Sequence, residues 1–121
     1  MSEAGRPWPT ELRLEKGGRA LSVAFDDGAQ FILEADYLRV ESPSAEVQGH
    51  GAGQKKLVTG KENVEIQTLE PVGNYAIRIL FDDGHDSGLF TWDYLHELGR
   101  EKDERRTAYI ARLTEAGLAK R

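Results

Sequence analysis

The sequence Phe-Asp-Asp-Gly occurs twice in this chain, at residues 25–28 and again at residues 81–84. An Asp-Gly pair favours the positive φ of a tight hairpin turn, so each copy predicts a reversal between two strands. An Asp-Tyr-Leu sequence follows each copy, at residues 36–38 and 93–95. The repeat therefore predicts two related halves, each with a strand, a turn, a second strand and the start of a helix.

The aspartates of these two turns allow two interpretations. We interpret them as residues that serve the turn only, because short Asp side chains commonly bond to nearby backbone groups in such turns. A carboxylate cluster that binds a metal is the alternative. It is disfavoured because adjacent residues on a strand or hairpin point to opposite faces.

Alternating apolar residues predict strands, and apolar residues at helical spacing predict helices. Strands are expected at residues 11–15, 21–25, 31–33, from 64 to a break at 70–74, 75–80 and 89–90, and helices at 92–98 and 101–118. Thr91 is the expected N-cap of the first helix and Gly99 its end. Residues 35–40 fit a strand or a helical turn, and the glycine-rich residues 41–63 predict a long functional or mobile loop.

The fold class expected from this pattern is α+β. A small, twisted, mostly antiparallel β-sheet of about six short strands would carry the C-terminal helices on it. The chain has 121 residues, which fits one domain. We assign residues 1–100 to the domain proper and residues 101–121 to a C-terminal helical extension of it. The alternating charges of residues 101–106 are interpreted as a solvated helix face.

Composition and charge exclude several classes of function. The chain has no cysteine, which removes disulfides, thiolate metal sites and cysteine nucleophiles. A net charge of −5 and the lack of a clustered basic face argue against nucleic-acid binding. No signal peptide or membrane-spanning run is recognisable, so a cytoplasmic protein without membrane association is expected.

The candidate contact residues are few. A glycine-rich run around His50 and Gln54 lacks the spacing of a phosphate-binding P-loop, so it is interpreted as a loop that contacts a partner. His85 and Asp86 resemble a general base with its orienting acid, but no nucleophile motif accompanies them. Trp92 is expected in the core, with a partner contact as its alternative. His50 and His85 are also the candidate metal ligands, and no catalytic residue is assigned.

Longer runs resemble a known family of small domains. These runs are Ser-Pro-Ser-Ala-Glu-Val at 42–47, Glu-Pro-Val-Gly-Asn-Tyr-Ala at 70–76, Phe-Asp-Asp-Gly-His-Asp-Ser-Gly at 81–88 and Trp-Asp-Tyr-Leu at 92–95. The chain resembles a bacterial stand-alone member of the gamma-butyrobetaine hydroxylase-like N-terminal domain family. The resemblance implies an α+β domain of unknown function. Such domains occur alone, ahead of the oxygenase domain of the hydroxylases, and attached to P-loop iron–sulfur cluster carriers.

The resemblance also implies a zinc site that this chain does not complete. In the hydroxylases the domain resembles a zinc module with cysteines at the positions of Ser42, Ser44 and approximately Val47, and a histidine at the position of His85. Serine is a poor zinc ligand and valine is none, so we expect neither zinc nor another cofactor.

These features together favour a non-enzymatic interaction or accessory module. By resemblance, its protein partner would be an oxygenase or an iron–sulfur cluster carrier. Hydroxylation by this chain is not expected, because no His-x-Asp or His-x-Glu pair is present. A metal-binding domain that uses His50, His85 and aspartates, or an accessory factor in iron–sulfur cluster carrier function, is the alternative. A small hydrolase or isomerase centred on His85 is a third hypothesis, and the oligomeric state stays open.

Overall fold

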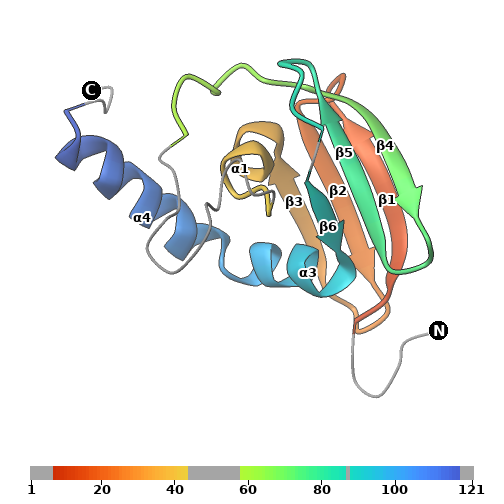
Figure 1. The fold of residues 1–121 in the computed structure, drawn as a ribbon. Coiled ribbons are helices and arrows are strands. Elements are labelled where there is room, and N and C mark those ends of the chain that lie inside the picture. The colour runs from red at the N-terminus through yellow and green to blue at the C-terminus, as the bar shows by residue number, and fades with distance from the viewer. Residues whose placement is uncertain (1–6, 44–57, 87, 118–121) are drawn as a thin grey trace.

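The computed structural model describes residues 7–43, 58–86 and 88–117. In these ranges the elements follow the order β1 (Pro9–Glu15), β2 (Ala20–Phe25), β3 (Gln30–Glu34), α1 (Ala35–Val40), β4 (Ile66–Val72), β5 (Ala76–Phe81), β6 (Leu89–Thr91), α3 (Trp92–Arg100) and α4 (Lys102–Glu115). The α+β class, the six short antiparallel strands and the C-terminal helices are confirmed (Figure 1).

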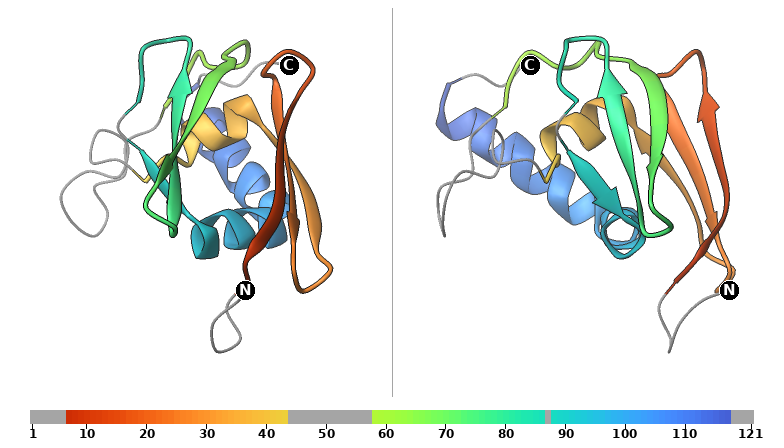
Figure 2. Two further views of the ribbon diagram at one scale, coloured as in Figure 1. Left: turned by 90° about the vertical axis from the view of Figure 1, so that its right-hand side faces the viewer. Right: turned by 45° about the vertical axis from the view of Figure 1, so that its right-hand side comes forward.

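The strands divide into two sheets rather than one. Each sheet is a three-stranded antiparallel meander, with β2 at the centre of one and β5 at the centre of the other. Figure 2 (left) shows the two sheets facing each other, with α1 and α3 between them on the side away from β1 and β4. Each half of the chain therefore forms a complete three-stranded sheet of its own. The two sheets bury their inner faces against each other and against the two helices.

The two halves repeat each other in detail, as the paired turns predicted. The central strands β2 and β5 have the same succession of buried and half-buried residues. Gly28 and Gly84 have φ angles of 89° and 90°. The carboxylates of Asp27 and Asp83 each accept a hydrogen bond from the backbone amide two residues further on, at 2.9 and 3.1 Å. The turn role of these second aspartates is confirmed, but they do not serve the turn alone, because Asp27 also lies 2.8 Å from His96 and Asp83 2.9 Å from Arg39.

The ambiguous segment 35–40 is the helix α1, which corresponds to the start of α3 in the second half. It buries its apolar side chains Ala35, Tyr37, Leu38 and Val40. Helix α3 belongs to the second half of the chain, and it buries Leu95 and Leu98 in the same core. The two helices thus supply the side of the core that the sheets leave open.

Two expected boundaries were wrong. The predicted break at residues 70–74 starts too early, because β4 runs to Val72 and pairs Pro71 with Ile77. Proline is tolerated there because β4 is an edge strand and needs no amide donor on its outer side. Helix α3 continues past Gly99 to Arg100. Gly99 is required for packing instead, since a Cβ atom there would lie 2.3 Å from the Phe31 ring.

Helix α4 differs from the other helices because none of its residues is buried. It extends from the end of α3 past α1 and away from the two sheets (Figure 1). It spans Lys102–Glu115, within the expected range of 101–118. No helix in the described ranges is both long and apolar enough to cross a membrane.

Candidate functional site

Helices α1 and α3 are joined by two equivalent tyrosine hydrogen bonds. The Tyr37 hydroxyl donates to the carbonyl oxygen of Leu98 at 2.7 Å, and the Tyr94 hydroxyl donates to that of Glu41 at 2.6 Å. Each acceptor lies four residues after the tyrosine of its own helix, so the two bonds are related by the repeat. Burial raises the pKa of Tyr94 to about 12 and that of Tyr37 further, so both hydroxyls act as neutral donors.

The second aspartate of each turn binds the helix of the other half. Asp27 Oδ2 lies 2.8 Å from His96 Nε2 in α3, while Asp83 Oδ2 lies 2.9 Å from Arg39 Nε in α1 and 2.7 Å from Lys61 Nζ. Burial alone would raise the pKa of Asp83, but the hydrogen bonds from Lys61, the His85 amide and Arg39 outweigh it and lower the pKa to about 2. These aspartates therefore tie the two halves together as well as forming their turns.

Ser42 and His85 form a buried side-chain pair. The Ser42 Oγ and His85 Nε2 atoms are 2.9 Å apart, and the two residues are 0% and 5% exposed. A Cβ atom at position 88 would lie 2.3 Å from the Ser42 oxygen, so Gly88 leaves room for the pair. The structure thus brings together two of the positions that the resemblance assigns to metal ligands, whereas Ser44 and Val47 lie outside the described residues.

The described part of the chain holds no group of three or more His, Cys, Asp or Glu side chains arranged to bind a metal ion. The Ser42 hydroxyl is also a poor ligand for zinc. Neither observation points to a metal centre beside the second turn.

Arg105 is the main contact between α4 and the rest of the domain. Its guanidinium lies 2.9 Å from the buried Glu41 carboxylate and 2.5 Å from Glu97, and it stacks on the Tyr94 ring with its central carbon 5.7 Å from the ring centre. Burial disfavours its charge, but the hydrogen bonds to Glu101 and Glu41 raise its pKa above the ordinary value. Arg105 is therefore held by several carboxylates at once.

Arg106 and Lys102 also attach α4 to carboxylates of the domain. Arg106 lies 3.1 Å from the Asp36 carboxylate and stacks on the Tyr37 ring at 5.4 Å. The Lys102 amine lies 2.9 Å from Glu34. Arg105 also pairs with Glu101, the N-cap of α4 itself, at 3.0 Å. The carboxylates before this N-cap that receive the three cations are Glu34, Asp36, Glu41 and Glu97, and we call them the acidic face.

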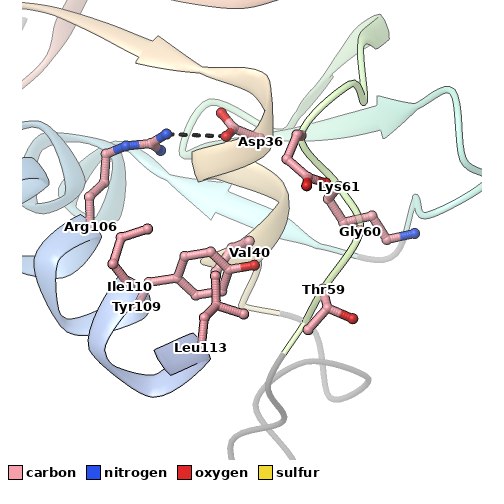
Figure 3. Close-up of a pocket in the computed structure, with 10 residues that line it drawn as sticks. Asp36, Val40, Thr59, Gly60, Lys61, Arg106, Tyr109, Ile110 and Leu113 are labelled. Atoms are coloured by element: carbon pink, nitrogen blue, oxygen red, sulfur yellow. Dashed lines mark hydrogen bonds and ion pairs between the residues drawn. The ribbon is translucent and has the colours of Figure 1, made fainter. Parts of the chain in front are cut away.

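Beside the acidic face, α1 and α4 leave an open groove of about 210 Å³ between them. Its apolar side chains are Val40 of α1 and Tyr109, Ile110 and Leu113 of α4 (Figure 3). Residues 59–62 close the far side. The Asp36–Arg106 ion pair forms one end of the groove (Figure 3). Ile110 is 54% exposed, so this groove leaves apolar surface uncovered.

The predicted contact residues are not gathered at this groove. His85 is buried, and Asp86 is exposed. Trp92 is half-buried, donates its indole N–H to the Asn74 carbonyl oxygen at 2.9 Å and contacts the Trp8 ring edge-on. His50 and Gln54 lie outside the described residues. Partner contact by these residues stays a prediction.

The sequence reasoning missed the residues that attach α4. It interpreted residues 101–106 as a solvated face, whereas Lys102, Arg105 and Arg106 hold the helix to the domain. One signal was available. Lys102, Arg105, Arg106 and Tyr109 lie at i, i+3, i+4 and i+7, which places them on one side of a helix.

The fold and these faces define a small α+β domain made of two similar halves with an added C-terminal helix. The chain belongs to the gamma-butyrobetaine hydroxylase-like, N-terminal family, whose sequence pattern it matches over residues 12–96. Helix α4 begins at Lys102 and lies beyond the matched range.

Solved structures support this assignment. One protein with an NMR solution structure is 47% identical, with a TM-score of 0.81 over 95% of this chain and 90% of that one. A crystal structure from Acidithiobacillus ferrooxidans, of a protein with unknown function from the DUF971 family, is 40% identical. It has a TM-score of 0.63 and covers 75% of this chain and 91% of that one.

Two curated plant proteins are also similar, and both are described as the chloroplastic Fe-S cluster assembly factor HCF101. The rice protein (Oryza sativa subsp. japonica) is 30% identical over 105 residues, which is 84% of this chain. The Arabidopsis thaliana protein is 29% identical over 97 residues, or 78% of this chain. The chain spans about a fifth of these relatives, 20% and 18% of their lengths.

Proposed function

We propose that this chain is a non-enzymatic protein-interaction module that serves an iron–sulfur cluster carrier. The observation that carries the proposal is the open, largely apolar α1–α4 groove beside a patch of charged side chains. A partly covered apolar surface with a charged rim is typical of a protein-binding site. The described residues that line the groove include no serine, cysteine or histidine, so the groove itself holds no nucleophile paired with a histidine base.

The class of partner is supported by the plant relatives. In them a region similar to this chain makes up about a fifth of a protein described as an Fe-S cluster assembly factor. We infer that a domain that is joined to such a factor in the plant proteins serves a comparable factor here as a separate chain. We therefore propose that the carrier binds this domain at the groove, while the chemistry of cluster transfer resides in the carrier.

The test is a binding measurement by isothermal titration calorimetry. This chain is titrated into the iron–sulfur cluster carrier of the same organism, once without a cluster and once with it. Thr59→Trp places a large ring at the rim of the groove, and Thr10→Trp makes the same change at an exposed site on β1. We expect the parent chain and Thr10→Trp to bind alike and Thr59→Trp to bind about tenfold more weakly or worse.

Two results would contradict the proposal. Absence of binding to the carrier in both of its states would remove the carrier as partner. Equal binding by Thr59→Trp and Thr10→Trp would remove the groove as the site.

A further inference from the structure

Helix α4 is attached to the domain in an unusual way. A surface helix is ordinarily held by an apolar stripe that faces the core. In α4 no residue is buried, and the first turns carry Lys102, Arg105 and Arg106 on the side that faces the domain. The helix is thus held by cations on carboxylates, by guanidinium groups stacked on tyrosine rings and, one turn further along, by a hydrogen bond from the Tyr109 hydroxyl to the Val58 carbonyl oxygen.

We propose that α4 occupies, within its own chain, a docking face for a basic helix of the partner. The partner helix carries Lys or Arg at positions i, i+3 and i+4 and takes the place of α4 on the acidic face. This inference rests on the proposed function, because it names the chemistry of the partner. The partner helix replaces the α4 side of the groove, while Val40 of α1 and residues 59–62 remain as its other side.

The acidic face explains why the partner must be basic. The Glu41 side chain is only 4% exposed and is paired with Arg105. A buried carboxylate that loses its cation is strongly unfavourable, so α4 leaves readily only when another cation replaces Arg105. The outcome is an exchange of one helix with a basic side for another, and a helix whose facing side is apolar or acidic does not satisfy the face.

The tyrosines favour arginine in the replacing helix. Arg105 stacks on Tyr94, and Arg106 stacks on Tyr37. A planar guanidinium stacks on an aromatic ring while it also bonds to a carboxylate, and an ammonium group does so less well. Two consecutive arginines on a partner helix would therefore stack on Tyr94 and Tyr37, as Arg105 and Arg106 do.

The extent of the family match supports this view of α4 as an occupant. Residues 12–96 match the family pattern, and they include Glu34, Asp36 and Glu41 of the acidic face. Helix α4 lies beyond them. Helix α4 has 14 residues, and a helix of that length is only marginally stable alone in water. It therefore detaches from the domain readily when a partner replaces its contacts.

The experiment uses the full chain and a synthetic peptide of residues 101–117. The peptide is labelled with a fluorophore, and its binding is followed by fluorescence anisotropy. In the double variant Arg105→Gln with Arg106→Gln, α4 no longer holds the acidic face. We expect the peptide to bind this variant at least about tenfold more tightly than the parent chain, in which α4 competes at high effective concentration.

A matched peptide and a second variant complete the design. The control peptide carries glutamine in place of Lys102, Arg105 and Arg106, and we expect it to bind neither chain. The single variant Arg106→Gln, which removes a partly exposed side chain, is expected to bind the unaltered peptide with intermediate affinity. Hydrogen exchange of β2 and β5 amides verifies that each variant is folded and shows whether α4 alone loses protection.

Equal peptide binding by parent and double variant would overturn the inference, and so would equal binding of the two peptides. Loss of protection across β2 and β5 together with α4 would also overturn it, because α4 would then be part of the cooperative fold. These outcomes are independent of the carrier. Carrier binding without peptide exchange removes only this inference, whereas peptide exchange without carrier binding removes the carrier as partner.

Discussion

The Tyr37 hydroxyl in α1 donates a hydrogen bond to the Leu98 carbonyl oxygen in α3, 61 residues further along the chain, at 2.7 Å. Leu98 lies in the last turn of α3, where carbonyl oxygens lack a partner within the helix. The Tyr94 hydroxyl likewise donates a hydrogen bond to the carbonyl oxygen of Glu41, the residue just after α1. Each half of the chain therefore completes the helix end of the other half.

This exchange predicts the effect of removing one hydroxyl. Tyr37→Phe should lower the free energy of unfolding by about 1–2 kcal/mol, because it leaves a buried carbonyl oxygen without its donor. Tyr75→Phe is the control, since that residue is 51% exposed. Urea denaturation of both variants measures the difference. An effect of Tyr37→Phe no larger than that of Tyr75→Phe would show that the bond contributes nothing to stability.

The ion pairs of Asp83 predict a dependence of stability on pH. Its pKa is about 2 in the folded chain against an ordinary 3.8, so the folded state favours the ionised carboxylate. The stabilisation is fully present above about pH 4 and is lost as the pH falls towards 2. One pKa unit corresponds to about 1.4 kcal/mol, but solvent screens a partly exposed pair, so Asp83→Asn should cost about 1–2 kcal/mol at neutral pH.

The Asp83 prediction is checked by urea denaturation of the parent chain and Asp83→Asn at several pH values. The difference between them should shrink as the pH approaches 2. Asp86→Asn, at an exposed neighbouring site, should leave the profile unchanged. A difference that stays constant down to pH 2 would show that the Asp83 charge is not the cause.

The contact between the two sheets predicts a contrast between neighbouring glycines. Gly18 has a φ of 99°, and a Cβ atom there would lie 2.3 Å from the Ile66 carbonyl oxygen. Gly17 has a φ of 68° with open space around it. Gly18→Ala should therefore destabilise the domain by about 2–4 kcal/mol, whereas Gly17→Ala should cost about 1 kcal/mol of backbone strain.

Thermal unfolding followed by circular dichroism compares the two alanine variants. The reverse order of stability, with Gly17→Ala the less stable, would mean that the close approach of residue 18 to β4 is not needed for the fold.

The Ser42–His85 pair predicts the metal content of the purified chain. Zinc should be present at far less than one ion per chain, because a serine hydroxyl replaces a thiolate at this position. Elemental analysis by mass spectrometry on protein without a histidine tag gives the ratio, with a known zinc protein measured in parallel. Thermal stability should be the same with and without EDTA. One zinc per chain, together with a loss of stability in EDTA, would refute this expectation.

Local sequence was sufficient where the backbone itself imposed the structure. Thr91 accepts a hydrogen bond from the Tyr94 amide, as its position before an apolar helix predicted. Residues 35–40 were ambiguous because the hydrogen bond that joins their helix to α3, from Tyr37 to Leu98, connects residues 61 positions apart in the sequence. Pro71 was misjudged because its place on an edge strand is a property of the assembled sheet.

The candidate site was less predictable than the fold. The alternating charges around Arg105 resemble those of any solvated helix. What distinguishes Arg105 is the buried carboxylate of Glu41, 64 residues earlier in the sequence. Neither the charge pattern nor the helical spacing indicates that this carboxylate lies beneath α4.

The sequence by itself determined the two Asp-Asp-Gly turns and the halves that they mark, because these tight turns need a positive φ that Gly28 and Gly84 adopt without strain whatever surrounds them. Only the tertiary structure decided how the halves meet. Asp27 and Asp83 each bind the helix of the opposite half, and Arg105 reaches carboxylates of both. Turn geometry depends on a few adjacent residues, whereas these pairings depend on which surfaces the assembled core leaves facing each other.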